Sequence, residues 1–135
     1  MPIHWFVEDG QPVSVNGDNY LELLEETVWL AVRIPTARKK LWFQQDCAPS
    51  HCTNRALAFL NEKLKSRVIS RRCSVPWPAY SPDLNPLDHR FWGSIESNIC
   101  KERPANITEL KSMVEKVASE ISVETITKSV QNILW

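Results

Sequence analysis

Two aspartates stand where an α/β domain could hold a divalent cation. Asp46 follows the apolar and aromatic run Leu41–Gln45, so it lies at the carboxyl end of an expected strand, where α/β sheets place functional groups. Asp88 lies in the first turn of an expected helix. Two carboxylates brought together repel unless a cation neutralises them, and their oxygens suit Mg²⁺ or Mn²⁺. Each also has a plainer interpretation, a strand-ending turn for Asp46 and a favourable acid at a helix N-terminus for Asp88.

The helix that begins near Asp88 carries an apolar stripe. Phe91, Trp92, Ile95 and Ile99 follow Asp88 at helical spacing. This spacing predicts that the Asp88 carboxylate leads the stripe and faces the core, where an acid needs a partner. A metal ion is one candidate for that partner.

The first third of the chain predicts a hairpin followed by a helix. Asp9-Gly10 is a turn sequence between two expected strands. Asn16 can cap the next element, whose apolar residues recur at helical spacing until Pro35 stops it. The expected strands are Ile3–Val7 and Val13–Val15, and the expected helix is Asp18–Val32.

A strand, a helix and a second strand follow in an order typical of parallel pairing. The strands are Leu41–Gln45 and Val68-Ile69, and Ser50 or Thr53 caps the helix between them. That helix should bury Ala56, Leu57, Leu60 and Leu64. Two more helices are expected at Ile107–Ile121 and Val123–Leu134. The sequence thus predicts one α/β domain.

Composition limits the function classes. The chain has 135 residues, 43% of them hydrophobic, with 16 basic and 16 acidic side chains. A net charge of zero argues against a self-sufficient nucleic-acid binder, because phosphate contacts demand a basic excess. No apolar run is long enough to span a membrane. Cys47, His51 and Cys52 could hold a soft metal, but reduced, partly buried thiols are the better interpretation of the cysteines.

Two motifs carry a family resemblance. Phe43–His51 reads F-Q-Q-D-C-A-P-S-H, and Trp77–Gly93 reads W-P-A-Y-S-P-D-L-N-P-L-D-H-R-F-W-G. Together, in this order, they resemble the catalytic domain of mariner-like (DDE/D) transposases. The resemblance implies a ribonuclease-H-like α/β fold, a mixed sheet flanked by helices, with three acids holding two Mg²⁺ or Mn²⁺ ions. Asp46 matches the second acid of that family and Asp88 the third.

The same resemblance implies parts that this sequence does not show. The family's first acid lies on a strand upstream of the opening hairpin, and Glu8 and Asp9 are the nearest acids here. Helix-turn-helix segments that bind transposon ends also precede the family's catalytic domain. We therefore expect residues 1–135 to form a single, N-terminally truncated catalytic domain, with little DNA cleavage by this chain alone.

Three functional hypotheses follow from the resemblance. The first is a partial cut-and-paste transposase that works on DNA transposon ends in the nucleus. The second is a non-enzymatic binding module, with two copies pairing through an exposed sheet edge. The third is a stand-alone nuclease that uses Glu8 or Asp9 as its missing acid.

Five further residues are candidates for supporting roles. His51 could hold the active-site loop or cap a helix. Asn85 and Tyr80 could order the proline-rich loop or approach DNA. Arg71 and Arg72 could bind phosphates, although two arginines at a strand end are more often solvated.

Overall fold

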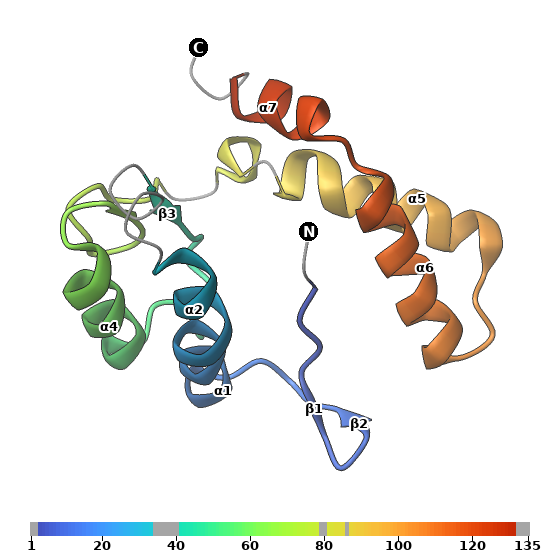
Figure 1. The fold of residues 1–135 in the computed structure, drawn as a ribbon, viewed down its shortest axis with the longest axis horizontal. Helices are drawn as coiled ribbons and strands as arrows, with labels where there is room; N and C mark the ends of the chain where they lie inside the picture. Colours follow the sequence, from blue (N-terminus) through green and yellow to red (C-terminus); the bar gives the residue numbers. More distant parts are fainter. Residues whose placement is uncertain (1–2, 34–40, 79–80, 86, 132–135) are drawn as a thin grey trace. The chain divides into compact units, whose positions relative to one another are not determined.

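The structure, a computed structural model, describes residues 3–33, 41–78, 81–85 and 87–131. The chain forms two compact units (Figure 1). The N-terminal unit is His4–Ala79, and the C-terminal unit lies within Tyr80–Trp135. The expected Pro35 helix stop, the Tyr80 side chain and the last residues of the final helix lie outside the described residues.

The N-terminal unit opens with a short hairpin. Strand β1 (Val7–Glu8) pairs antiparallel with β2 (Gln11–Pro12) across the predicted Asp9-Gly10 turn. Both turn residues have positive φ, 49° and 75°, as a two-residue turn with the twist of a hairpin requires. The strands are shorter and closer to the turn than Ile3–Val7 and Val13–Val15, because the ladder ends once the N–H of Val13 has bonded the oxygen of Phe6.

The predicted first helix is one continuous helical segment of three parts. It runs through α1 (Gly17–Glu22), the π-helical turn η1 (Leu23–Val28) and α2 (Trp29–Val32). The Asn16 cap is confirmed, since its side chain accepts the N–H groups of Asp18 and Asn19 while Asn19 bonds back to the Asn16 N–H. The helix therefore starts where the sequence predicts, whereas the π turn has no local sequence signature.

The β-α-β order gives the predicted parallel pair. Strand β3 (Phe43–Gln44) pairs with β4 (Val68–Ile69), and α4 (Asn54–Leu64) connects them. Thr53 caps α4 by accepting the N–H of Ala56, so Thr53 rather than Ser50 is the cap. The core of this unit is a cluster of buried side chains from α1, η1, α4 and β4, namely Tyr20, Leu24, Ala56, Leu60, Leu64 and Val68.

The N-terminal ends of α1 and α4 approach each other at Gly17. A Cβ built on Gly17 would lie 2.5 Å from Cγ2 of Thr53. Thr53 cannot move freely away, because its β-branched side chain is stiff and its hydroxyl caps α4. Arg55 and Asp18 join the same ends through a 2.6 Å contact. The close approach thus depends on the missing side chain at Gly17.

We predict that Gly17→Ala lowers the free energy of unfolding by about 1–2 kcal/mol, although alanine has the better helix propensity. Gly93→Ala is the control, because Gly93 is also the first residue of an α-helical stretch, here one that continues η3, and its added Cβ would meet no atom within 4 Å. The control should be neutral or stabilising by up to about 1 kcal/mol. Urea denaturation measures both, and equal effects of the two substitutions would contradict the steric explanation.

The C-terminal unit is helical. A short 3₁₀ turn, η2 (Pro82–Leu84), precedes the π-helical η3 (Leu87–Trp92), which continues into α5 (Gly93–Glu102). Helix α6 (Ile107–Glu120) packs against α5, and α7 (Val123–Gln131) follows (Figure 1). Phe91 and Ile95 are buried as predicted, and Val114 and Val117 of α6 are buried too.

The prediction that the Asp88 carboxylate faces the core was wrong. Asp88 is exposed, and so is Trp92, whereas Phe91 is buried. The π-helical geometry of η3 explains the difference. Its hydrogen bonds span five residues, so one turn holds more than four residues. Phe91 therefore lies farther around the helix from Asp88 than in an α-helix, whereas Asp88 and Trp92 stay on one side. The two therefore share an exposed face.

Candidate functional site

Asp46 follows β3 after one intervening residue, Gln45, in the loop that leads to α4. One of its oxygens, Oδ1, accepts two hydrogen bonds, from the backbone N–H of Ala48 at 3.0 Å and from Nδ1 of His51 at 2.6 Å. The first of these closes an Asx turn within the loop. No described residue bonds Oδ2 of Asp46, and the side chain keeps 40% of its surface exposed. The loop thus fixes one carboxylate oxygen and leaves the other open.

His51 is held on three sides. Besides its bond to Asp46, its ring lies 4.3 Å from the ring of Tyr20, centroid to centroid. Its backbone oxygen accepts a hydrogen bond from Nε2 of Gln45 at 2.8 Å. The suggestion that His51 holds the loop therefore agrees with the geometry, and Thr53 takes the capping role instead.

A buried polar network lies beneath this loop. Tyr20 donates its hydroxyl to Oε1 of Gln45 at 2.7 Å, and Nε2 of Gln45 also donates to Oγ of Ser70 at 2.9 Å. Burial, with the negative charge of Asp46 as the second cause, raises the pKa of Tyr20 above its ordinary value. Tyr20 therefore stays a hydrogen-bond donor at neutral pH.

Sequence reasoning missed Tyr20, Gln45 and Ser70 as site-supporting residues. Gln45 and Ser70 are 6% and 0% exposed. Gln45 directly precedes Asp46 in the motif, and Tyr20 is an inward position of the first helix. Strand alternation places Gln45 inward and Gln44 outward, which is the one local pattern that could have identified Gln45.

Asp88 belongs to the C-terminal unit. Its Oδ2 accepts a hydrogen bond from Nδ2 of Asn85 at 3.0 Å. The expectation that Asn85 orders the proline-rich loop agrees with this contact. Asp83 lies in the η2 turn and is exposed. Asp46 and Asp88 lie in different units, and their pairing stays a prediction.

The two arginines after β4 differ. Arg72 has a left-handed φ of 61° and donates from its guanidinium to the backbone oxygen of Cys52 and, at 3.4 Å, to Oδ1 of Asn54. Arg72 therefore ties the turn after β4 to the start of α4, although its side chain, like that of Arg71, is exposed. Phosphate binding by either residue stays a prediction.

The cysteines are free thiols of unequal exposure. Cys52 is buried, Cys47 and Cys73 are half-buried, and Cys100 is exposed, so partial burial does not describe all four. Burial raises the pKa of the Cys52 thiol. Within the described residues, no group of three or more His, Cys, Asp or Glu side chains could hold a metal ion, and this includes the Cys47, His51 and Cys52 group.

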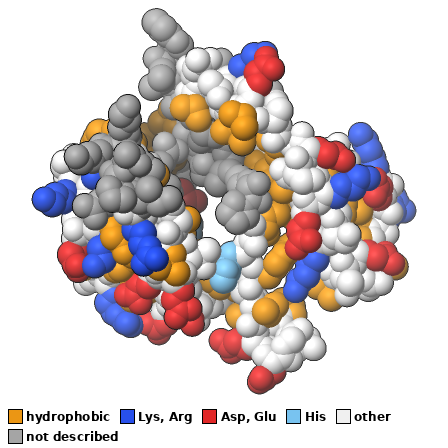
Figure 2. All heavy atoms as spheres, in the orientation of Figure 1, with side chains coloured by type: hydrophobic (Ala, Val, Ile, Leu, Met, Phe, Trp, Pro, Cys, Tyr) orange, Lys and Arg blue, Asp and Glu red, His pale blue; other side chains and the backbone are white. Residues whose placement is uncertain are grey.

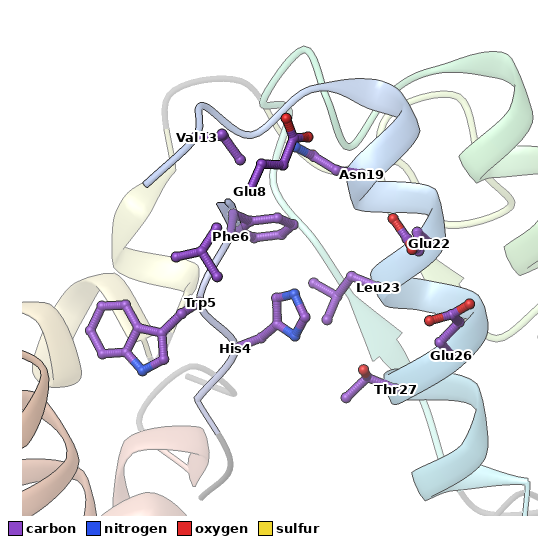
Figure 3. A pocket seen from close by; sticks show the side chains of 11 residues that line it. His4, Trp5, Phe6, Glu8, Val13, Asn19, Glu22, Leu23, Glu26 and Thr27 are labelled. Carbon is purple, nitrogen blue, oxygen red and sulfur yellow. The ribbon is translucent and has the colours of Figure 1, made fainter. Parts of the chain in front are cut away.

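A cavity of about 210 Å³ lies elsewhere in the N-terminal unit, between segment 4–8 and the helix face that carries Glu22, Leu23 and Glu26. Figure 3 shows His4 and Phe6 pointing toward that helix and Trp5 pointing away from it. Asp46 and His51 do not line this cavity. Glu8, one of the two alternative acids, does line it, away from the loop that holds Asp46.

Strand β1 also has an edge that faces away from β2. Phe6 and Glu8 direct their backbone groups toward β2, so the N–H and oxygen of Val7 point to the opposite edge. The described sheet pairs β1 with β2 alone. Pairing of two copies through such an edge stays a prediction.

Charge is mixed over the surface. On the face drawn in Figure 2, Lys and Arg side chains lie among Asp and Glu side chains, in agreement with the net charge of zero. No helix in the described part of the chain is both long and apolar enough to cross a membrane.

Known proteins resemble this chain in sequence and in backbone arrangement. The transposable element Tcb2 transposase of Caenorhabditis briggsae is 28% identical over 107 residues, which cover 79% of this chain and 36% of the relative. The Tcb1 transposase of the same organism is 26% identical over the same length and the same shares. The chain resembles the Tc1/mariner transposases. The recognition made from the two motifs is thereby confirmed.

The fold agrees with a solved transposase domain. The crystal structure of the catalytic domain of Mos1 mariner transposase matches 91% of this chain with a TM-score of 0.74 at 23% identity, and the match covers 59% of that domain. The chain therefore has a mixed α/β structure with the ribonuclease-H-like fold of that catalytic domain. It spans about a third of the length of the curated relatives, 36% in each case. No family model matches the sequence.

Proposed function

We propose that this chain is part of the catalytic domain of a cut-and-paste DNA transposase, in which Asp46 and Asp88 hold a divalent cation. The observation that carries the proposal is the Asp46 loop. In a chain that resembles transposases, this carboxylate follows the strand at which the motif places it, with Oδ1 fixed by two hydrogen bonds and Oδ2 open.

The donor set fits Mg²⁺ or Mn²⁺. Both ions favour carboxylate oxygens and keep several waters, so one or two aspartates with open oxygens suffice as protein ligands. Asp46 and Asp88 are both accessible to solvent, and each has one oxygen held by a neighbouring side chain. A bound cation would activate water and stabilise the leaving oxygen in phosphodiester cleavage.

A complete site would need a third acid, which the resemblance places on a strand outside this sequence. The chain alone would then cut DNA weakly or not at all, because the cation geometry depends on every ligand. A longer protein that includes that strand would act on transposon ends in the nucleus. Truncation of the sheet, DNA as partner and nuclear location are all parts of this proposal.

The test is cleavage of the backbone by a bound redox metal. Fe²⁺ would replace Mg²⁺ in the purified chain, and peroxide with ascorbate would then produce radicals that cut the chain near the metal. We expect cuts around both Asp46 and Asp88, suppressed by excess Mg²⁺ or by Asp88→Ala. Cuts around one aspartate only, unaffected by Asp88→Ala, would contradict a shared cation.

A further inference from the structure

The polar network under the Asp46 loop connects side chains of the core to the backbone of the loop. Gln45 alone connects three segments, since its amide bonds the Tyr20 hydroxyl, Ser70 Oγ and the backbone oxygen of His51 at 2.7–2.9 Å. The first two partners are side chains of the core. The third is the backbone of the very residue whose ring holds Asp46.

The bond to the His51 backbone sets the path of the loop. The loop turns tightly, because the N–H of His51 donates to the backbone oxygen of Ala48 at 3.0 Å. Gln45, which follows β3, holds the His51 end of the loop through its bond to the His51 oxygen. That anchoring places Nδ1 of His51 at 2.6 Å from Oδ1 of Asp46. A carboxylate accepts hydrogen bonds, so this contact requires a proton on Nδ1 of the His51 ring.

The position of His51 determines which oxygen of the Asp46 carboxylate is available to a cation. Oδ1 of Asp46 is occupied by His51 and by the N–H of Ala48, which leaves Oδ2 as the oxygen available to a cation. Residues that hydrogen-bond a metal ligand, and so orient it, contribute strongly to metal affinity. Gln45 is 6% exposed and does not itself reach a cation, so it acts through the loop.

We propose that Gln45 is a positioning residue for the cation site. Through the backbone of His51 it fixes the loop so that Oδ1 of Asp46 is occupied and Oδ2 stays open. This inference rests on the proposed function for the cation itself, whereas the link from Gln45 to His51 stands on the contacts alone.

The test replaces Gln45 by methionine, which has a similar shape but neither donor nor acceptor. Two readouts apply at fixed pH, the ¹⁵N shifts of the His51 ring and the Mn²⁺ dissociation constant. We expect the His51 ring to lose its single Nδ1–H tautomer and to give shifts averaged over both tautomers. Mn²⁺ affinity should fall by about tenfold, the lower end for residues that orient a ligand.

The matched control is the double variant Tyr20→Phe/Ser70→Ala. It removes the other two bonds of Gln45 and keeps the bond to His51. The control should lose stability but keep the His51 tautomer and the Mn²⁺ affinity. If Gln45→Met does not fold, Gln45→Glu keeps the acceptor for Tyr20, lacks the donor to His51, and is read by the ¹⁵N shifts alone.

The outcomes separate the two proposals. An unchanged His51 spectrum in the Gln45 variants, or the same spectral change in the control, overturns the positioning role. Absence of Mn²⁺ binding in the unaltered chain overturns the cation site, while the ¹⁵N comparison still decides whether Gln45 orders the loop.

Discussion

Asp46→Asn should weaken Mn²⁺ binding by more than about 100-fold, which corresponds to about 2.8 kcal/mol of binding free energy. The reason is electrostatic. The substitution keeps the shape of the side chain and an oxygen that can accept the Ala48 N–H, but it removes the negative charge that compensates the cation. Residues that only orient a ligand contribute 10–100-fold, so a direct ligand should exceed that range.

Isothermal calorimetry with Mn²⁺ measures this effect, and two variants control it. Asp83→Asn changes an exposed aspartate of the η2 turn and should leave the dissociation constant unchanged. Glu8→Gln tests the nuclease alternative, because Glu8 lines the cavity by segment 4–8 and not the Asp46 loop. A large loss of affinity in Glu8→Gln would favour that alternative, and a small loss in Asp46→Asn would refute Asp46 as a ligand.

The sequence predicted the elements whose patterns are local. Ala56, Leu57, Leu60 and Leu64 recur at helical spacing, and all four are buried in α4. The Asp9-Gly10 turn and the Asn16 cap depend on the conformational preferences of single residues, so they also follow from the sequence. The parallel pairing of β3 with β4 followed from the order of strand, helix and strand.

The features that the sequence did not predict depend on contacts between residues far apart in the chain or on an unusual helical geometry. Gln45 bonds both Tyr20 and Ser70, each of which lies 25 residues away in the sequence, and no periodicity links the three. The exposed position of Asp88 arises from the π-helical turn η3, which changes the face on which each side chain lies. Helical spacing alone assumes 3.6 residues per turn, and that assumption fails at this site.

The stability of the N-terminal unit limits every experiment on the Asp46 loop, because Tyr20 belongs both to the polar network and to the core cluster. That cluster is small, and Leu24 is its most deeply placed large side chain at 1% exposure. Leu24→Ala should therefore lower the free energy of unfolding by about 2–5 kcal/mol, since it removes buried apolar surface and leaves a cavity.

Leu30→Ala is the matched control for this prediction, because Leu30 lies on the same helical segment but is 48% exposed. Leu30→Ala should lower the free energy of unfolding by less than about 1 kcal/mol. Urea denaturation followed by tryptophan fluorescence compares the two, with Trp29, which packs against the core, among the six tryptophans that report. A whole domain is stable by only about 5–15 kcal/mol, so Leu24→Ala should also loosen the Tyr20–Gln45 contact and with it the His51 ring. Equal losses in the two variants would show that the cluster around Leu24 is not what holds this unit together.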